Sequence, residues 1–449
     1  MMRLTQAFVR SAAYERRFLA KNPWDLAMVL WIPLATVLLI WWIFSQTQIS
    51  DLPIGVIDQD QSPMANTLVR YLEASPDITI ANFYNSPAAA KDGILQRDVY
   101  ALVIIPENFS RNILSGKPSP IILQVNAQYG THSGIIQKGV QSVAGTLSAG
   151  VEIQRLVKQG ISPTQAAIAY SPINIQRTSL FNAATNYQQF LASTVIPALL
   201  HILAMVIGAT TIGRELRDKQ LGRWYRFIEG RSSKLSLATD DIVSTKNSAN
   251  NHLTSSSVSN SNNIKDQSSR TNLTAPIAAV TKSVSISVLL AGLAGKYCWP
   301  ALAYSLWALL AIWLATPQYP TAPSSLLATY IGLVLLMMLS LWLGAIFTLA
   351  SFSLRAGLSA TGFISAPSYA FAGVTFPYIA ISDGAKHWSD MLPLTYYLKL
   401  HIAQLQMHAP LAVSLSIVYG LALATIIAML LTALLSKRAL ANPQRWGAR

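Results

Sequence analysis

The chain has 449 residues, of which 52% are hydrophobic and 12% are charged, and its formal net charge is +14. Ordinary soluble domains carry about 25% charged residues, so the composition excludes a typical soluble protein and indicates a chain solvated largely by lipid. Its single cysteine, Cys298, excludes an internal disulfide.

Residues 1–22 are predicted to form an amphipathic helix that lies in the cytoplasmic headgroup region of a membrane. At 100° per residue the apolar side chains gather on one face and the cations on the other. Glu15 is the exception, because it interrupts the apolar face. The cationic face consists of Arg3, Arg10, Arg17 and Lys21.

Five stretches contain no Asp, Glu, Lys or Arg: 26–50, 178–213, 297–354, 356–382 and 400–436. A helix needs about 20 mainly apolar residues to cross a bilayer core, so each stretch can hold at least one span. The longest holds two, separated by a proline-rich hairpin at 316–325. The apolar segment 283–295 is too short to cross and is expected at the interface. We therefore predict six transmembrane helices, near 28–46, 189–212, 298–315, 326–350, 356–378 and 412–435.

The distribution of Lys and Arg predicts the orientation of these spans. Five basic residues precede the first span and four lie in the tail at 436–449. Segment 214–283 has eleven basic and six acidic residues, whereas 51–177 has nine of each. The positive-inside rule then places both termini and 214–283 in the cytoplasm, and 51–177 outside. Because this topology accounts for the positive net charge, the charge gives little reason to predict a surface that binds nucleic acid.

Segment 51–177 is predicted to be a folded extracytoplasmic α/β domain. Apolar strands are expected at 54–58, 78–84, 100–106 and 120–127, and Ser-Pro pairs between them are typical helix starts. This β-α-β-α-β-α-β alternation indicates helices packed on one small sheet. Residues 132–160 are also expected to be helical. The fold class is thus an α-helical polytopic membrane protein with six transmembrane helices and an inserted α/β extracytoplasmic domain.

A dense cluster of mixed charge, GRELRDKQLGRW, follows the second span within the cytoplasmic segment 213–231. One interpretation is a surface that docks onto a soluble partner through complementary charge. The other is a solvated segment that only keeps the span from slipping. Residues 232–275 contain 24 Ser, Asn or Thr among 44 and are expected to be disordered, as an insert.

The sequence lacks the motifs of an enzyme that hydrolyses ATP or peptides: a P-loop, HExxH and GxSxG are absent. Asp58 and Asp60 could form a catalytic pair or a cation site, but the simpler interpretation is that they end a strand and solvate a turn. His201 is an ionisable residue inside a predicted span, which makes it a functional candidate. A neutral imidazole could equally bond a neighbouring helix. We expect no cofactor, no metal and no enzymatic activity.

Three stretches carry distinctive motifs: IGVIDQDQSPMANTLVRYLEAS (54–75), YALVIIPENFSRNILSGKPSPIILQVN (100–126) and FAGVTFPYIAISDGAKHWSDMLPLTYYLKLHIAQL (371–405). Together they resemble the type-2 (ABC-2-type) permeases of ABC exporters, which carry a large outer domain after the first span. The first stretch is similar to the family's opening strand and helix, the second to its next segment, and the third to its re-entrant stretch and outer amphipathic helix. The likeness covers nearly all of the chain except 232–282.

Two places depart from the family pattern. GRELRDKQLG (213–222) matches the element after the second span only in part, because Lys219, Gln220 and Leu221 interrupt its spacing. The family often has Asn-Pro before the second span, where this chain has Ala183. LLAGLAGKYCWPAL (289–302) resembles the entry to the third span, with Lys296 at the cytoplasmic interface.

The resemblance implies the membrane subunit of an exporter in a bacterial inner membrane, working with a separate ABC ATPase. Because the predicted spans offer almost no buried charge to hold a polar molecule, we expect a hydrophobic or amphipathic substrate. A second permease copy or a related permease would complete the path, and membrane lipid and a periplasmic adaptor protein are further possible partners. A receptor or assembly scaffold acting through the outer domain is the alternative. The family's ATPase-coupling residues would be Gly213, Arg214, Glu215 and Arg217. Its conduit candidates, together with His201, would be Phe376, Pro377 and Tyr378.

Overall fold

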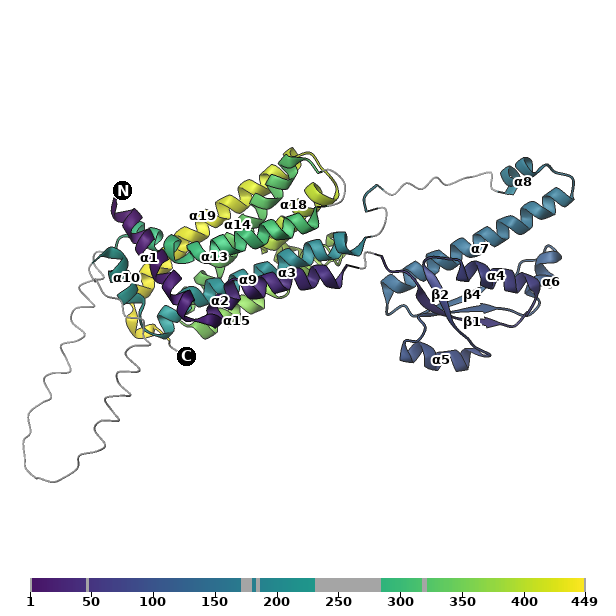
Figure 1. The fold of residues 1–449 in the computed structure, drawn as a ribbon, viewed down its shortest axis with the longest axis horizontal. Helices are drawn as coiled ribbons and strands as arrows, with labels where there is room; N and C mark the ends of the chain where they lie inside the picture. Colours follow the sequence, from purple (N-terminus) through teal and green to yellow (C-terminus); the bar gives the residue numbers. More distant parts are fainter. Residues whose placement is uncertain are drawn as a thin grey trace, which may run out of the picture. The chain divides into compact units, whose positions relative to one another are not determined.

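The computed structural model describes residues 2–45, 48–170, 180–182, 186–230, 284–316 and 321–447. The chain divides into two compact units, one of Met1–Ser45 with Phe181–Arg449 and one of Gln46–Leu180. The predicted insert at 232–275 and Ala183 lie outside the described residues. Within the described part the chain is mostly helical, with one small sheet (Figure 1).

The sheet of the unit Gln46–Leu180 has four strands in the order β2-β1-β3-β4. Strand β1 pairs in parallel with β2 and β3, and β4 runs antiparallel to β3. Every residue of β3 is buried, because both of its faces are covered. The strands are β1 Leu52–Asp58, β2 Ile78–Phe83, β3 Ala101–Ile105 and β4 Ile122–Val125.

Helices cover the two faces of this sheet. Leu68 and Ile136, from α4 and α7, join one core, and Ala90 of α5 joins a smaller one on the other face. The hydroxyls of Ser62 and Ser86 accept hydrogen bonds from the amides three residues later, at 3.1 and 3.2 Å, so both predicted Ser-Pro starts are confirmed. The helices are α4 Pro63–Glu73, α5 Pro87–Gln96, α6 Phe109–Leu114, α7 Gly130–Lys158 and α8 Pro163–Tyr170. The predicted alternation is confirmed.

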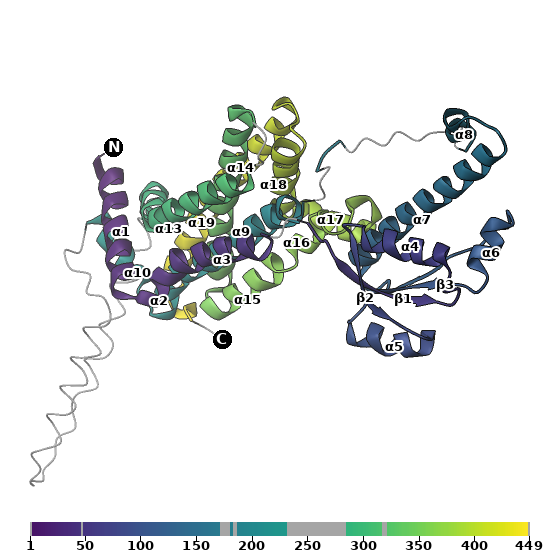
Figure 2. The ribbon, with the colours of Figure 1, turned by 45° about the vertical axis from the view of Figure 1, so that its right-hand side comes forward.

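The other unit is helical in its described part (Figures 1 and 2). Its first half contains α1 Met2–Lys21, α2 Pro23–Val29, α3 Trp31–Ile43, η1 Gln188–Ala192, α9 Ser193–Arg217 and α10 Leu221–Glu229. Its second half contains α13 Ile286–Ala315, α14 Pro323–Ser351, α15 Leu354–Ser365, α16 Ser368–Phe371, η3 Tyr378–Ala380, α17 Asp383–Met391, α18 Pro393–His401, η4 Ile402–Gln406, α19 Ala412–Ala441 and η5 Pro443–Arg445.

Four helices in the described residues are long and apolar enough to cross a membrane: Gln188–Arg217, Ile286–Ala315, Pro323–Ser351 and Ala412–Ala441. Helices α2 and α3 are bent by 41° at Leu30 and would make a fifth span if counted together. The described residues therefore contain four such helices, or up to five, where the sequence predicts six.

Two sequence predictions differ from the structure. The segment 283–295 was expected at the interface, but from Ile286 it is continuous with α13, because Lys296 is buried and paired and so does not end the helix. The predicted span at 356–378 is not one helix. Helix α15 ends at Ser365, just before Pro367, and Gly373 adopts a left-handed φ of 78°. Proline and a left-handed glycine both interrupt helical hydrogen bonding.

Helices α9 and α14 pack with their backbones in close contact. A Cβ added to Gly208 would stand 2.1 Å from the carbonyl oxygen of Leu341, and one added to Gly344 would stand 2.0 Å from that of Met205. Small residues permit such close packing of membrane helices. On another side α14 packs against α19, where the Thr425 hydroxyl donates to the Leu335 carbonyl at 3.3 Å.

Candidate functional site

The mixed-charge cluster lies where α9 ends, and its first two charged residues face inward. Arg214 and Glu215 are only 6% and 2% exposed. Both therefore need partners inside the protein, because a buried unpaired charge is strongly unfavourable. Those partners come from α1 and α13, helices far away in the sequence.

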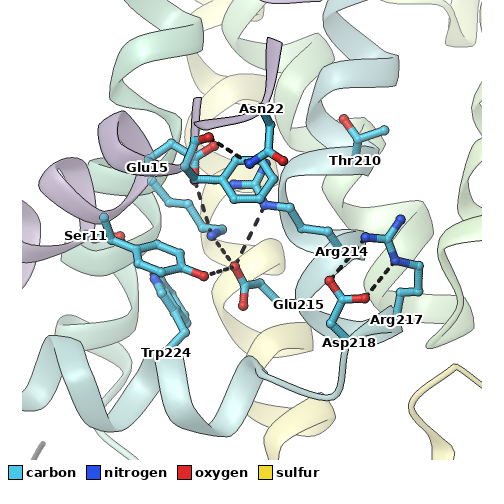
Figure 3. Close-up of polar contacts among 12 residues, drawn as sticks. Ser11, Glu15, Asn22, Thr210, Arg214, Glu215, Arg217, Asp218 and Trp224 are labelled. Atoms are coloured by element: carbon cyan, nitrogen blue, oxygen red, sulfur yellow. Dashed lines mark hydrogen bonds and ion pairs between the residues drawn. The ribbon is translucent and has the colours of Figure 1, made fainter. Parts of the chain in front are cut away.

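Four charged side chains form this buried ion network: Glu15, Arg214, Glu215 and Lys296 (Figure 3). Glu15 Oε2 contacts the Arg214 guanidinium and lies 3.3 Å from Lys296 Nζ. Lys296 Nζ lies 2.7 Å from Glu215 Oε1, which is also 3.9 Å from Arg214 Nε. Two carboxylates thus balance two cations.

Aromatic side chains surround the network, and one of them adds a hydrogen bond to it. The Tyr14 hydroxyl donates to Glu215 Oε1 at 3.2 Å. Burial, followed by the charge of Glu215, raises the pKa of Tyr14, so this hydroxyl remains a donor. Lys296 Nζ lies 4.8 Å from the centroid of the Tyr14 ring, and the Arg214 guanidinium lies 3.7 Å from that of Phe18. Trp224 of α10 donates to the Ser11 hydroxyl at 3.2 Å.

The network joins α1, α9 and α13, and the Trp224 bond adds α10. Gly295, beside Lys296, allows α1 to approach, since a Cβ there would stand 2.2 Å from the carbonyl oxygen of Phe8. Glu15, which interrupts the apolar face of the first helix, is the residue that fixes α1 to the ends of the other two. These contacts connect α1 and α10 to α9 and α13.

The predicted coupling residues divide into buried and exposed ones. Gly213 packs against α15, where an added Cβ would stand 2.5 Å from Leu354 Cδ1. Arg214 and Glu215 belong to the network and present no side chain to a partner. Arg217 is exposed and pairs with Asp218 at 2.8 Å. Of the three charged residues predicted to couple, Arg217 is therefore the one exposed to a partner.

Further exposed arginines lie on α10. Arg223 and Arg226 are exposed, whereas Trp224 and Tyr225 are buried in the core. The exposed cations near the network thus include Arg217, Arg223 and Arg226. The sequence signal that could have revealed them is the amphipathic period of α10, whose apolar and basic residues alternate at helical spacing.

The conduit candidates lie on different elements. His201 is buried between α9 and α14, where its Nδ1 lies 2.6 Å from Ser340 Oγ. This bond to a neighbouring helix is the simpler of the two interpretations of the residue. Phe376, 52% exposed, and Pro377 lie between α16 and η3. The hydroxyl of Tyr378, the first residue of η3, donates to Asp390 Oδ2 at 2.9 Å.

Asp58 and Asp60 end strand β1 and bind backbone amides. Asp58 Oδ1 accepts from the amides of Asp60 and Gln61 at 3.0 and 2.9 Å, and Asp60 Oδ2 accepts from that of Ser110 at 3.0 Å. The Ser62 hydroxyl, with backbone amides, lowers the pKa of Asp60. In the described ranges no group of three His, Cys, Asp or Glu could hold a metal ion. These carboxylates close a turn.

Part of the chain matches the model of a known protein family. Residues 23–225 match the model of a family described as "ABC-2 family transporter protein". The match begins at α2 and ends in α10, so it includes the sheet-containing unit and the cluster that ends α9. No curated protein and no solved structure matches the chain.

Proposed function

Residues 23–225 match the ABC-2 transporter family, and from this match we propose that the chain is an ABC-2-type permease, the membrane subunit of an ATP-driven exporter. ATP hydrolysis takes place on a separate ABC ATPase, which is consistent with the absence of a P-loop from the sequence. Two copies, or this chain and a related permease, form the path between them. The membrane is the inner membrane of a bacterium.

The observation that carries this proposal is the link between an exposed basic surface and the spans. Arg217, Arg223 and Arg226 provide the surface, and the ion network connects α10 and α1 to α9 and α13. Closure of an ATPase against this surface is passed to two candidate spans through Arg214 and Glu215. In this scheme the two buried residues transmit the movement, and the arginines make the contact.

The proposed topology has both termini in the cytoplasm and 51–177 outside. The remaining crossing, which is the fifth in chain order, is formed by the interrupted segment of α15 and α16. A re-entrant stretch near 371–400 follows it. Cysteine labelling in a Cys298→Ser background tests this arrangement. Labelling of a cysteine at Arg70 from the cytoplasmic side only would contradict it.

The proposed substrate is hydrophobic or amphipathic. The buried charges of the described helices are gathered in the network at the end of α9, and all of them are paired. The spans therefore offer little to hold a polar ion. Transport of a small hydrophilic ion, with no transport of lipophilic compounds, would contradict this assignment.

The proposal is tested by purifying the tagged protein from membranes in mild detergent and identifying co-purified proteins by mass spectrometry. We expect an ABC ATPase with the wild type, and about tenfold less of it with Arg223→Glu and Arg226→Glu combined, since like charge at an interface opposes binding. Arg70→Glu, on α4, is the matched control and retains the ATPase. A folded wild type that brings down no ATPase would favour the receptor or scaffold instead.

A further inference from the structure

A groove of about 680 Å³ lies between α14, α19 and the start of α18. Leu343 is on its α14 side, and Gly420 and Leu431 are on its α19 side. Both long helices are candidate membrane spans. Gly420 and Leu431 are exposed, so the groove opens to the surface of the helical unit.

The polarity of this groove changes along its length. Of its fourteen lining residues only Ser416 and Tyr396 carry a polar side-chain group, and both lie near the α18 end. From Ser416 to Leu431 the groove follows α19 for roughly 22 Å, at 1.5 Å per residue. It therefore has one hydroxyl-bearing end and a long apolar remainder, which matches a molecule with a polar head and an apolar chain.

A cation lies at the polar end. Lys399 is exposed, and its Nζ is 5.5 Å from the centroid of the Tyr396 ring and 4.9 Å from that of Tyr378. Among the ion pairs of the described residues, none includes Lys399. Asp390 is the acid nearby, and its carboxylate accepts the Tyr378 hydroxyl while its carbonyl accepts that of Tyr396 at 2.8 Å. The ammonium is thus free to meet an anionic head.

We propose that this groove binds an anionic phospholipid, with an acyl chain along α14 and α19 and the phosphate at Lys399. An apolar groove cannot satisfy the hydrogen bonds of water, so hydrocarbon is its natural content within a membrane. Its volume lies in the range of about 300 to 1,000 Å³ typical of ligand sites. The proposal does not depend on the transport function.

Gly420 allows the groove to be filled without disturbing the packing. A Cβ added there meets no heavy atom within 4 Å, and the same holds for Gly362 of α15, outside the groove. Gly420→Phe should therefore block the acyl chain, and Gly362→Phe is its matched control. Equal melting temperatures of the two variants establish that both are folded.

The measurement is native mass spectrometry of the full chain purified from nanodiscs of phosphatidylglycerol or phosphatidylcholine. We expect the wild type and Gly362→Phe to retain one phosphatidylglycerol, and Gly420→Phe to retain about tenfold less. Lys399→Gln should lower the preference for phosphatidylglycerol by about fivefold, since a cation near an anionic headgroup contributes about that factor.

Three results would overturn the proposal. The first is equal lipid retention by Gly420→Phe and the wild type, which would place the lipid elsewhere. The second is an unchanged headgroup preference in Lys399→Gln. The third is a wild-type dimer without retained lipid that Gly420→Phe dissociates, which would make the groove a contact between two copies of the chain.

Discussion

Glu15 shows how a single residue can determine the position of a helix. It lies on the apolar face of α1, where a carboxylate would be costly without partners, and it finds two in Arg214 and Lys296. Because the four network charges sum to zero, removing any one leaves a buried net charge. The position of α1 against α9 and α13 therefore depends on all four charges of the network being present.

This dependence predicts a non-additive double-mutant cycle. Glu15→Gln alone should destabilise the helical unit by about 3–5 kcal/mol, because it leaves a buried cation without its partner. Lys296→Gln alone should destabilise the unit by a similar amount, because it leaves buried carboxylate charge without its cation. The double variant restores neutrality, so its effect should fall short of the sum by about 1 kcal/mol or more. Melting temperatures of the detergent-solubilised protein measure the three variants.

An exposed pair supplies the control for that cycle. Glu152 and Arg155 form an ion pair on α7 with side chains 35% and 49% exposed. Such pairs contribute little in water, so Glu152→Gln should leave the melting temperature unchanged. Strict additivity of the Glu15 and Lys296 effects would contradict a shared buried network.

The sequence could predict only part of this site. The cluster at 214–219 stands out beside a charge-free stretch, and Arg214 and Glu215 within it are named from the sequence. Their burial could not be predicted, because it depends on partners 199 and 81 residues away in the sequence. No local pattern relates Glu15 or Lys296 to that cluster.

At the scale of elements, the contact between α9 and α14 depends on two glycines. Gly208→Ala should separate these helices, because its Cβ would collide with the backbone of Leu341. Overpacking of this kind costs about 1–3 kcal/mol. We expect a lower melting temperature and less folded protein after extraction from membranes.

Gly362→Ala is the matched control, because a Cβ added at this position meets no heavy atom within 4 Å. It should be neutral or slightly stabilising, since glycine inside a helix costs about 0.5–1 kcal/mol relative to alanine. If both variants melt at the wild-type temperature, close backbone packing does not hold α9 to α14.

The elements of the sheet-containing unit were predictable because each has local signals. Serine caps, prolines and apolar runs mark its strands and helices, and every predicted strand is present within a few residues. The charge-free stretch 356–382 contains no charged residue to mark a boundary within it. There the hydropathy predicts one span, whereas Pro367 and Gly373 divide it in the structure. Hydropathy thus detects apolar segments better than it detects where a helix ends.

At the scale of the whole molecule, the chain combines a helical unit with a separate α/β unit inserted after α3. The family match includes parts of both and ends at α10, beside the exposed arginines. In the proposed function this α10 surface receives an ABC ATPase. Burial of Arg214 and Glu215 makes substitutions there ambiguous, because lost binding and lost folding would look alike.

Site-directed photo-crosslinking tests that claim most directly. A photo-crosslinking amino acid replaces exposed Arg226 on α10 or, as a control, exposed Arg70 on α4, and adducts formed in intact cells are identified by mass spectrometry. The account predicts an adduct with an ABC ATPase from position 226 and none from position 70. Absence of the adduct at 226 in a folded protein, or its equal formation at position 70, would contradict the account.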